Sequence, residues 1–238
     1  MKFYDLHVHS AFSEGKSSLK ELAEMAKTLG YKGICFSAYY KDRNQQTILQ
    51  TEIEKIKQQT GIEIFLGFEA RNVKELQLLA KRRREFDILL VRGGNLRLNR
   101  KACETPEVDI LTHPEYERND SGFNHILAKL ARKNEVAIEI NFREVLNSSK
   151  KTRSLILKNI QQNVKIAKKY KVPIIISSGA ISHWELKAPE VLISFGCLVG
   201  LELKEAKETL SKIPEKIIKK IEERKNKEWI MPGVKVIK

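Results

Sequence analysis

Residues 5–13 read DLHVHSAFS, and this short stretch combines a strand pattern with a metal-site pattern. Residues 3–9 are predicted to form a short buried strand. Side chains two apart in a strand project to the same face, so His7 and His9 should point in one direction. Histidine is the commonest metal ligand, and two adjacent imidazoles can share one cation. The stretch therefore predicts a strand that brings a polar site to its carboxyl end.

The same unit of strand followed by helix repeats along the chain. Further apolar runs predict strands at residues 33–36, 62–68, 87–91, 109–111, 136–140 and 173–177. Helical patterns join them at residues 19–29, which Ser17 or Ser18 can cap, and at 45–59, 73–84, 121–133 and 152–170. Shorter helices are expected at 189–195, 203–210 and 214–225. Near-continuous apolar strands joined by helices indicate parallel pairing with both faces covered. With at least seven such strands, we expect an α/β fold, an irregular TIM-like (β/α) barrel whose functional face lies at the strand ends where the βα loops begin.

Length and composition predict one domain over residues 1–238, with no linker or repeat. The basic segment from about residue 211 and the tail at 229–233 are expected either to dock on this domain or to be mobile. Without an apolar run of about 18 residues or a charged and then apolar leader, we expect no membrane association and a cytoplasmic protein. Cys35, Cys103 and Cys197 are odd in number and far apart, which argues against a disulfide framework or a dedicated zinc cluster. We expect them in or near the core.

The chain is strongly basic, with 44 Lys and Arg against 30 Asp and Glu and a net charge of +14. Such an excess suits a polyanionic partner, and nucleic acid is the leading candidate. A thermophile surface rich in Lys and Glu is the alternative, but such surfaces tend toward balanced ion pairs.

The start of the chain resembles a known superfamily. His7 and His9 followed by Ser13-Glu14-Gly15 resemble the opening motif of the polymerase-and-histidinol-phosphatase (PHP) superfamily. Its members are metal-dependent phosphoesterases on irregular α/β barrels, so the resemblance implies a PHP-like barrel with metal ligands spread over the strand ends.

Only part of that ligand set is present. Two later motifs are matched by Glu69 in Gly67-Phe68-Glu69 and by His113 in Thr112-His113-Pro114. Where the superfamily typically has Thr-Asp-His this chain has residues 37–39, SAY, and where it has Ser-Asp-Ala-His the chain has residues 178–181, SGAI. We therefore expect no metal cluster, and His7, His9, Glu69 and His113 would be a vestigial site. These groups could hold one ion or satisfy one another's hydrogen bonds.

Several internal motifs resemble a narrower family. Residues 136–149, VAIEINFREVLNSS, together with 91–95, VRGGN, 99–104, NRKACE, and 108–111, VDIL, resemble the archaeal ribonuclease P protein component 3 family. This family is homologous to the thirty-kilodalton subunit of the eukaryotic enzyme, and the resemblance runs from residue 5 to roughly 210. It implies a barrel that kept its fold and gave up the phosphoesterase role.

The resemblance also implies the activity and the partners. Ribonuclease P (RNase P) is the ribonucleoprotein endonuclease that removes the 5′ leader of precursor tRNA, and its RNA carries the Mg²⁺-dependent catalytic centre. A protein of this family pairs with a small ferredoxin-like subunit and, with other RNase P proteins, stabilises the catalytic RNA. We accordingly assign no catalytic residue and no bound cofactor to this chain.

Basic and amide side chains after two strands are the candidate contacts for RNA or a partner. Arg forks and Asn amides suit phosphates, ribose hydroxyls and base edges. The candidates are Arg92, Asn95 and Arg100 after the fourth strand, Asn141 and Arg143 after the sixth, and the helix end Lys81, Arg82, Arg83 and Arg84. Equally open is an internal role, in which Asn141 and Arg143 cap the next loop or pair with Glu139 and Glu144.

Two competing functions remain. A free-standing PHP-type metal-dependent phosphoesterase would need the ligands that residues 37–39 and 178–181 lack. A generic basic scaffold for any RNA would have no defined protein partner.

Overall fold

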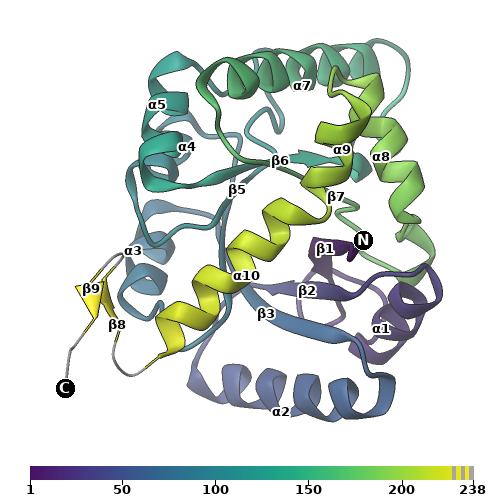
Figure 1. The fold of residues 1–238 in the computed structure, drawn as a ribbon, viewed down its shortest axis with the longest axis vertical. Coiled ribbons are helices and arrows are strands. Elements are labelled where there is room, and N and C mark those ends of the chain that lie inside the picture. The colour runs from purple at the N-terminus through teal and green to yellow at the C-terminus, as the bar shows by residue number, and fades with distance from the viewer. Residues whose placement is uncertain (227–228, 232–233, 236–238) are drawn as a thin grey trace.

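Seven parallel strands form the centre of the protein (Figure 1). The computed structural model describes residues 1–226, 229–231 and 234–235. The strands are β1 Tyr4–His9, β2 Gly33–Ala38, β3 Glu63–Ala70, β4 Ile88–Arg92, β5 Ile110–Thr112, β6 Ala137–Asn141 and β7 Ile174–Ser177. Neighbours in the sheet follow chain order, and every adjacent pair is parallel. The prediction of seven parallel strands is confirmed.

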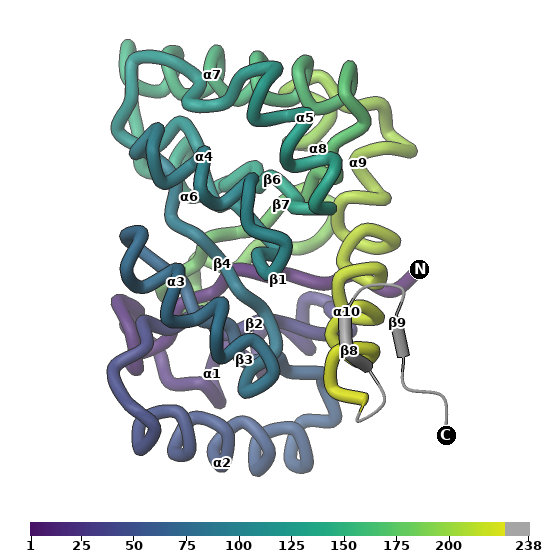
Figure 2. Tube along the Cα trace, turned by 90° about the vertical axis from the view of Figure 1, so that its left-hand side faces the viewer, coloured from purple at the N-terminus to yellow at the C-terminus, as the bar shows by residue number. Residues whose placement is uncertain are grey.

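Helices follow the strands and surround them (Figure 2). They are α1 Leu19–Thr28, α2 Arg43–Thr60, α3 Val73–Lys81, α4 Leu96–Glu104, α5 His125–Asn134, α6 Phe142–Leu146, α7 Lys150–Tyr170, the 3₁₀ turn η1 His183–Glu185, α8 Pro189–Leu198, α9 Leu203–Thr209 and α10 Lys212–Lys225. Ser18 forms a capping box with Glu21, so the second of the two predicted caps starts α1. The sequence patterns missed α4 and α6. None of the described helices combines the length and apolar composition that crossing a bilayer requires.

The sheet curls into a nearly closed barrel. Its first and last strands, β1 and β7, are joined by hydrogen bonds between β1 and the residues at the end of β7. Asp5 on β1 is fully buried, and its carboxylate accepts a hydrogen bond from the backbone N–H of Ser178 at 3.1 Å. The backbone N–H of His9 donates to the carbonyl of Ala180 at 2.8 Å. Burial raises the pKa of Asp5 to about 6. These contacts join the two edge strands, and the predicted TIM-like barrel is confirmed.

The amino ends of the strands are covered by α10. Its Ile217, Ile218 and Ile221 are buried against the side chains that fill the barrel, among them Leu6 and Ile110. Arg224 reaches Asp109, just before β5, with 2.8 Å between Nη1 and Oδ1. The basic segment after residue 211 is thus a docked helix as far as Lys225.

Two smaller predictions need comment. Cys35 and Cys103 are buried, but Cys197 is exposed near the end of α8, so its expected place near the core is wrong. The tail forms an antiparallel pair of strands, β8 Trp229–Met231 and β9 Val234–Lys235, and the prediction for Pro232 and Gly233 lies outside the described residues.

Candidate functional site at the barrel mouth

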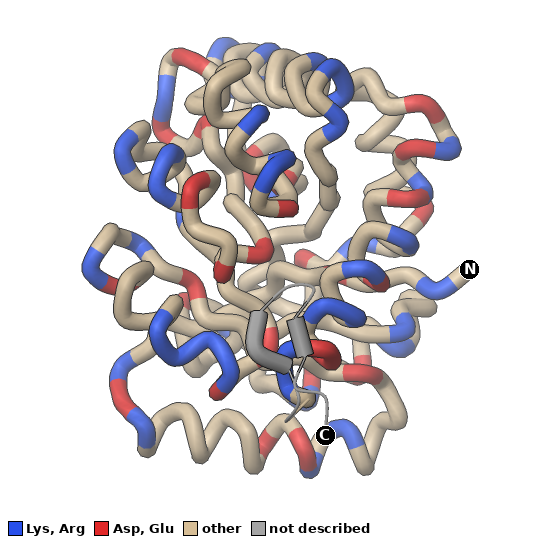
Figure 3. The backbone as a smooth tube through the Cα atoms, turned by 60° about the vertical axis from the view of Figure 1, so that its left-hand side comes forward, with Lys and Arg blue, Asp and Glu red and all other residues tan. Residues whose placement is uncertain are grey.

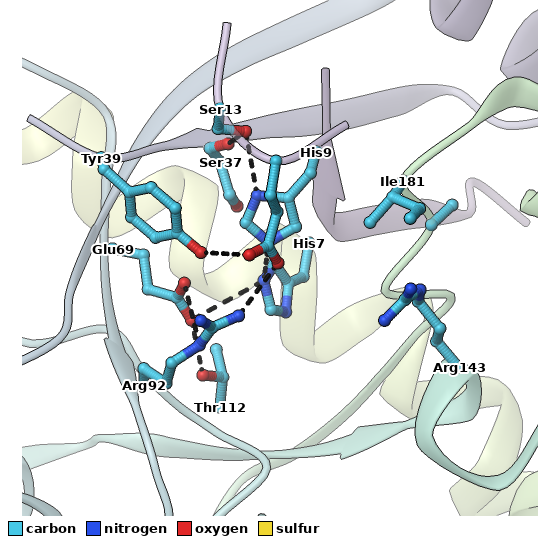
Figure 4. A network of polar contacts seen from close by, with 12 residues as sticks. His7, His9, Ser13, Ser37, Tyr39, Glu69, Arg92, Thr112, Arg143 and Ile181 are labelled. Atoms are coloured by element: carbon cyan, nitrogen blue, oxygen red, sulfur yellow. Dashed lines mark hydrogen bonds and ion pairs between the residues drawn. The ribbon is translucent and has the colours of Figure 1, made fainter. Parts of the chain in front are cut away.

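Polar side chains meet at the carboxyl ends of the barrel strands, and Figure 4 shows His7, His9 and Glu69 among them. His7 and His9 come from β1, Glu69 from β3, Glu139 from β6 and Ser177 from β7, and all five are buried. The Nε2 atoms of His7 and His9 are 2.9 Å apart, so the two rings do face the same side of the strand. A ligand atom from each of His7, His9 and Glu69 lies within 4.8 Å of the other two.

His7 and Glu139 form a buried ion pair at the centre of this site. His7 Nδ1 lies 2.7 Å from Glu139 Oε1, and Ser177 donates to the same carboxylate. Burial opposes both charges, but each stabilises the other, so the pKa of His7 rises to about 9 and that of Glu139 falls to about 2. Burial and the nearby His7 charge lower the pKa of His9 to about 4. A charged His7 can therefore donate to both Glu139 and a neutral His9.

Arg92 supplies a second cation at the mouth. Its Nη2 lies 2.9 Å from Glu14 Oε1, and its Nε lies 3.6 Å from Glu69 Oε2. The guanidinium carbon is 5.7 Å from the ring centres of both Tyr39 and Tyr116. Although burial opposes the charge, these carboxylates raise the pKa of Arg92. Arg92 is therefore a fixed internal cation beside Glu69.

A cavity of about 260 Å³ opens between these groups, and Arg92, His113, Asn141 and Arg143 line it. Asn141 is buried and its amide donates to Glu139 at 3.4 Å. Arg143 pairs at 3.1 Å with Glu185 of η1. The alternative that these two residues pair inside the protein is thus correct for Asn141 and Glu139, but Arg143 pairs with Glu185 and not with Glu144. The predicted partner Glu144 lies 3.2 Å from His113 Nδ1.

The residues present do not fit the multi-metal centre that the superfamily implies. Gly179, where an Asp is expected, has φ +62°, and a Cβ there would lie 2.5 Å from the Asn141 side chain. Ile181 offers no ligand atom, and Tyr39 donates its hydroxyl hydrogen to Glu14 at 2.8 Å. Arg92 adds a permanent positive charge beside Glu69, and this charge disfavours the binding of a metal cation at that carboxylate. Three ligands, from His7, His9 and Glu69, remain for a single ion.

The other predicted contact residues lie away from the cavity. Asn95 caps α4 by accepting from the backbone N–H of Leu98 at 3.1 Å. Arg100 is exposed on α4 and pairs with Glu104 at 2.8 Å. Neither residue lines the cavity that Arg92, Asn141 and Arg143 line, and their contact with RNA or a partner stays a prediction.

The basic helix end at 81–84 divides into two parts. Arg83 is buried, and its guanidinium donates to the carbonyls of Glu107, Phe86 and Asp87 and to Asp109, so its prediction as an RNA contact is wrong. Arg82 lies over the Tyr40 ring at 4.4 Å and pairs with Glu85. Lys81 and Arg84 are exposed.

Sequence reasoning missed several members of the site. Glu14 belongs to the opening motif and Glu139 was considered as a partner of Asn141, but neither was predicted to be a site residue, although Glu139 and Asn141 are two apart on one face of β6. Ser177 and Tyr116 carry no signal of their own, because only the closed barrel brings them beside residues distant in sequence.

The comparisons with known proteins agree on one family. The model of the family described as RNase P subunit p30 matches residues 2–226. Ribonuclease P protein component 3 of Methanosarcina mazei is 36% identical over 239 residues, covering 99% of this chain and 96% of that protein. The Methanosarcina acetivorans protein of the same name is 38% identical over 241 residues, with coverage of 99% and 96%.

Solved structures give the same result. A chain in the cryo-EM structure of archaeal ribonuclease P with mature tRNA is 30% identical, with a TM-score of 0.83 and 98% of both chains covered. A Xaa-Pro dipeptidase reaches a TM-score of 0.60 at 9% identity, covering 93% of this chain and 76% of that one, which shows likeness of fold alone. On the family match, the relatives and the solved archaeal structure together, the chain belongs to the RNase P subunit p30 family.

Proposed function

We propose that the chain is a protein subunit of RNase P, the ribonucleoprotein that removes the 5′ leader of precursor tRNA. One observation carries the proposal: the whole chain resembles a chain within an archaeal RNase P that holds tRNA, with 98% of both covered. The likeness covers the whole barrel, so the described residues form no additional domain that would suggest a separate activity. It favours the subunit over a free-standing phosphoesterase and over a generic RNA scaffold.

The chain contributes binding and no chemistry. Its mouth holds paired charges, His7 with Glu139 and Arg92 with Glu14, and it lacks the ligand set for a multi-metal centre. Metal-assisted phosphoester cleavage needs cations with an open position for the attacking hydroxide. A single ion held by His7, His9 and Glu69 would not supply that cluster. Catalysis in the assembly belongs to the Mg²⁺-dependent RNA.

The partners follow from charge and family. A net charge of +14 supports association with the RNase P RNA, since Lys and Arg that neutralise phosphates release condensed counterions. The protein partners are a small ferredoxin-like subunit and the other RNase P proteins, in a cytoplasmic assembly that acts on precursor tRNA. The pair of proteins stabilises the catalytic RNA domain.

Purification of the tagged protein from its native cells tests the proposal. One RNA able to cleave precursor tRNA at the mature 5′ end should co-purify in stoichiometric amount, together with the other subunits. Recovery of the chain free of RNA, with phosphatase activity of its own, would favour the phosphoesterase. Recovery of many unrelated RNAs without a defined protein partner would favour the generic scaffold.

A further inference from the structure

A groove lies at the opposite end of the barrel from the mouth. It runs between α10 and the carboxyl ends of α5 and α7, beside Ala137 and Ile174 at the starts of β6 and β7. Its volume is about 670 Å³, against about 260 Å³ at the mouth. The residues that line it include seven Lys or Arg and four Glu, so the groove is positively charged.

Most of the acidic groups in this groove are already neutralised. Three of the four glutamates have a lysine partner in the groove: Glu205 with Lys168 at 2.6 Å, Glu208 with Lys212 at 2.7 Å, and Glu135 with Lys220 at 3.6 Å. The remaining four cations, Arg132, Lys171, Lys216 and Lys219, are exposed, and their side chains form no hydrogen bond or ion pair with the part of the chain that the structure describes. Two carboxylates oppose them: Glu223, the fourth glutamate of the groove, and Glu208, which attracts Lys216 although it is paired with Lys212.

The cations of α10 form a row. Lys212, Lys216 and Lys219 are four and three residues apart, which places them on one face of the helix over a length of about 10 Å. Lys and Arg side chains in the last turn of a helix interact favourably with the helix dipole. This interaction accounts for the positions of Arg132 in α5 and Lys168 in α7. It does not explain the row, which begins at the first residue of α10.

The mouth offers no comparable positive surface. Arg92 is paired with Glu14, Arg143 with Glu185 and His7 with Glu139, so the described cations there are already neutralised by the protein. On most other outer helices Lys and Arg alternate with Asp and Glu (Figure 3), but α7 has Lys and Arg without any Asp or Glu. Another hollow, of about 510 Å³ on α7, is lined by Lys150, Arg153 and Lys158 and by no carboxylate among the described residues. The α10 groove gathers more cations than either the mouth or the α7 hollow.

We propose that the α10 groove binds the sugar-phosphate backbone of RNA, an inference that rests on the proposed function and adds the contact surface. Lysines act as flexible point charges that suit phosphate oxygens. No aromatic side chain lines the groove among the described residues, so bases have no stacking platform there. Contact is thus to phosphates, and it positions the RNA without reading its sequence.

Two variants with equal loss of charge test the groove. The groove variant carries Arg132→Gln, Lys171→Gln, Lys216→Gln and Lys219→Gln. The control carries the same change at four exposed lysines that do not line the groove, Lys27, Lys55, Lys74 and Lys129. All eight side chains are exposed, so both variants should fold, and circular dichroism checks this. Binding to the RNase P RNA is measured by fluorescence anisotropy between about 50 and 200 mM salt.

In a plot of the logarithm of the binding constant against the logarithm of salt concentration, the groove variant should flatten the slope by about 0.7 to 0.9 for each phosphate that is no longer neutralised, or about 3 for all four. The control variant should change this slope by less than about 1. Equal flattening in both variants would overturn the groove and assign binding to diffuse charge. An unchanged slope together with failure to bind a partner protein would make the groove a protein surface and also overturn the proposal. Either result leaves the proposed function standing. Failure of the wild-type chain to bind the RNA at about 50 mM salt would instead contradict that function.

Discussion

Replacing Arg224 by Met should destabilise the protein far more than a neighbouring charge change of the same kind. The Arg224 side chain is 5% exposed, Asp109 is 1% exposed, and their Nη1 and Oδ1 atoms are 2.8 Å apart. Met keeps most of the apolar stem while removing the charge. The change leaves one oxygen of a buried carboxylate without its cationic partner.

The size of the effect follows from what stays in place. Removing one partner of a buried ion pair costs about 3–5 kcal/mol. Asp109 keeps its contacts with Arg83 and with the backbone N–H of Leu89 at 2.9 Å, so we expect the lower end, about 3 kcal/mol. Lys225, the next residue, pairs with Asp87 but is 52% exposed, and Lys225→Met should cost below about 1 kcal/mol.

Urea unfolding of the two variants measures both values. Although burial opposes ionisation, Arg83 and Arg224 hold the pKa of Asp109 below its usual value. The stabilisation from this carboxylate is therefore present above the unfolded pKa and lost as pH falls through the folded pKa, so the gap between wild type and Arg224→Met should close in strong acid. A cost for Arg224→Met no larger than that of Lys225→Met at neutral pH would refute the reasoning.

Three further outcomes are expected. The purified chain alone should hydrolyse neither phosphomonoesters nor precursor tRNA, and metal-stimulated turnover that disappears in His7→Ala would overturn this. Gly179→Asp should lower the free energy of unfolding by about 1–3 kcal/mol, because φ is +62° and Asn141 lies 2.5 Å from the new Cβ. Adding Ile181→His to this variant should not create phosphatase activity. A double variant as stable as wild type in thermal melts would contradict the steric argument. RNA binding should weaken steeply with salt, by about 0.7 to 0.9 in the log–log slope for each neutralised phosphate, and a slope near zero in a titration would point to a protein-only role.

The strands were predictable because each is an apolar run with a distinct boundary. Residues 87–91 and 136–140 need no partner to be recognised as buried strands, and the structure has β4 and β6 there within one residue. The helix α4 was missed because its sequence, LRLNRKACE, is rich in Arg and Lys. Its helical form depends on the Asn95 cap and on burial of Leu98, Ala102 and Cys103 against the barrel.

The site could be predicted only in part, for a related reason. His7 and His9 are two apart on one strand, so local geometry determines that they face the same side. Arg143 pairs with a residue 42 positions away and Arg224 with one 115 away, and only the folded barrel decides such pairs. Arg83 looked like a surface cation because two of its four acceptors, on Glu107 and Asp109, are 24 and 26 positions away and meet it only in the fold.

Cleavage of precursor tRNA by the reconstituted RNase P RNA tests the central claim most directly. The rate is measured at low Mg²⁺ with the RNA alone, with this chain, with the small ferredoxin-like subunit, and with both proteins. The account predicts little effect of this chain alone and a marked lowering of the Mg²⁺ requirement when both proteins are present. Cleavage by the chain without the RNA, or no stimulation by the two proteins together, would contradict the assignment of this barrel as a non-catalytic subunit of RNase P.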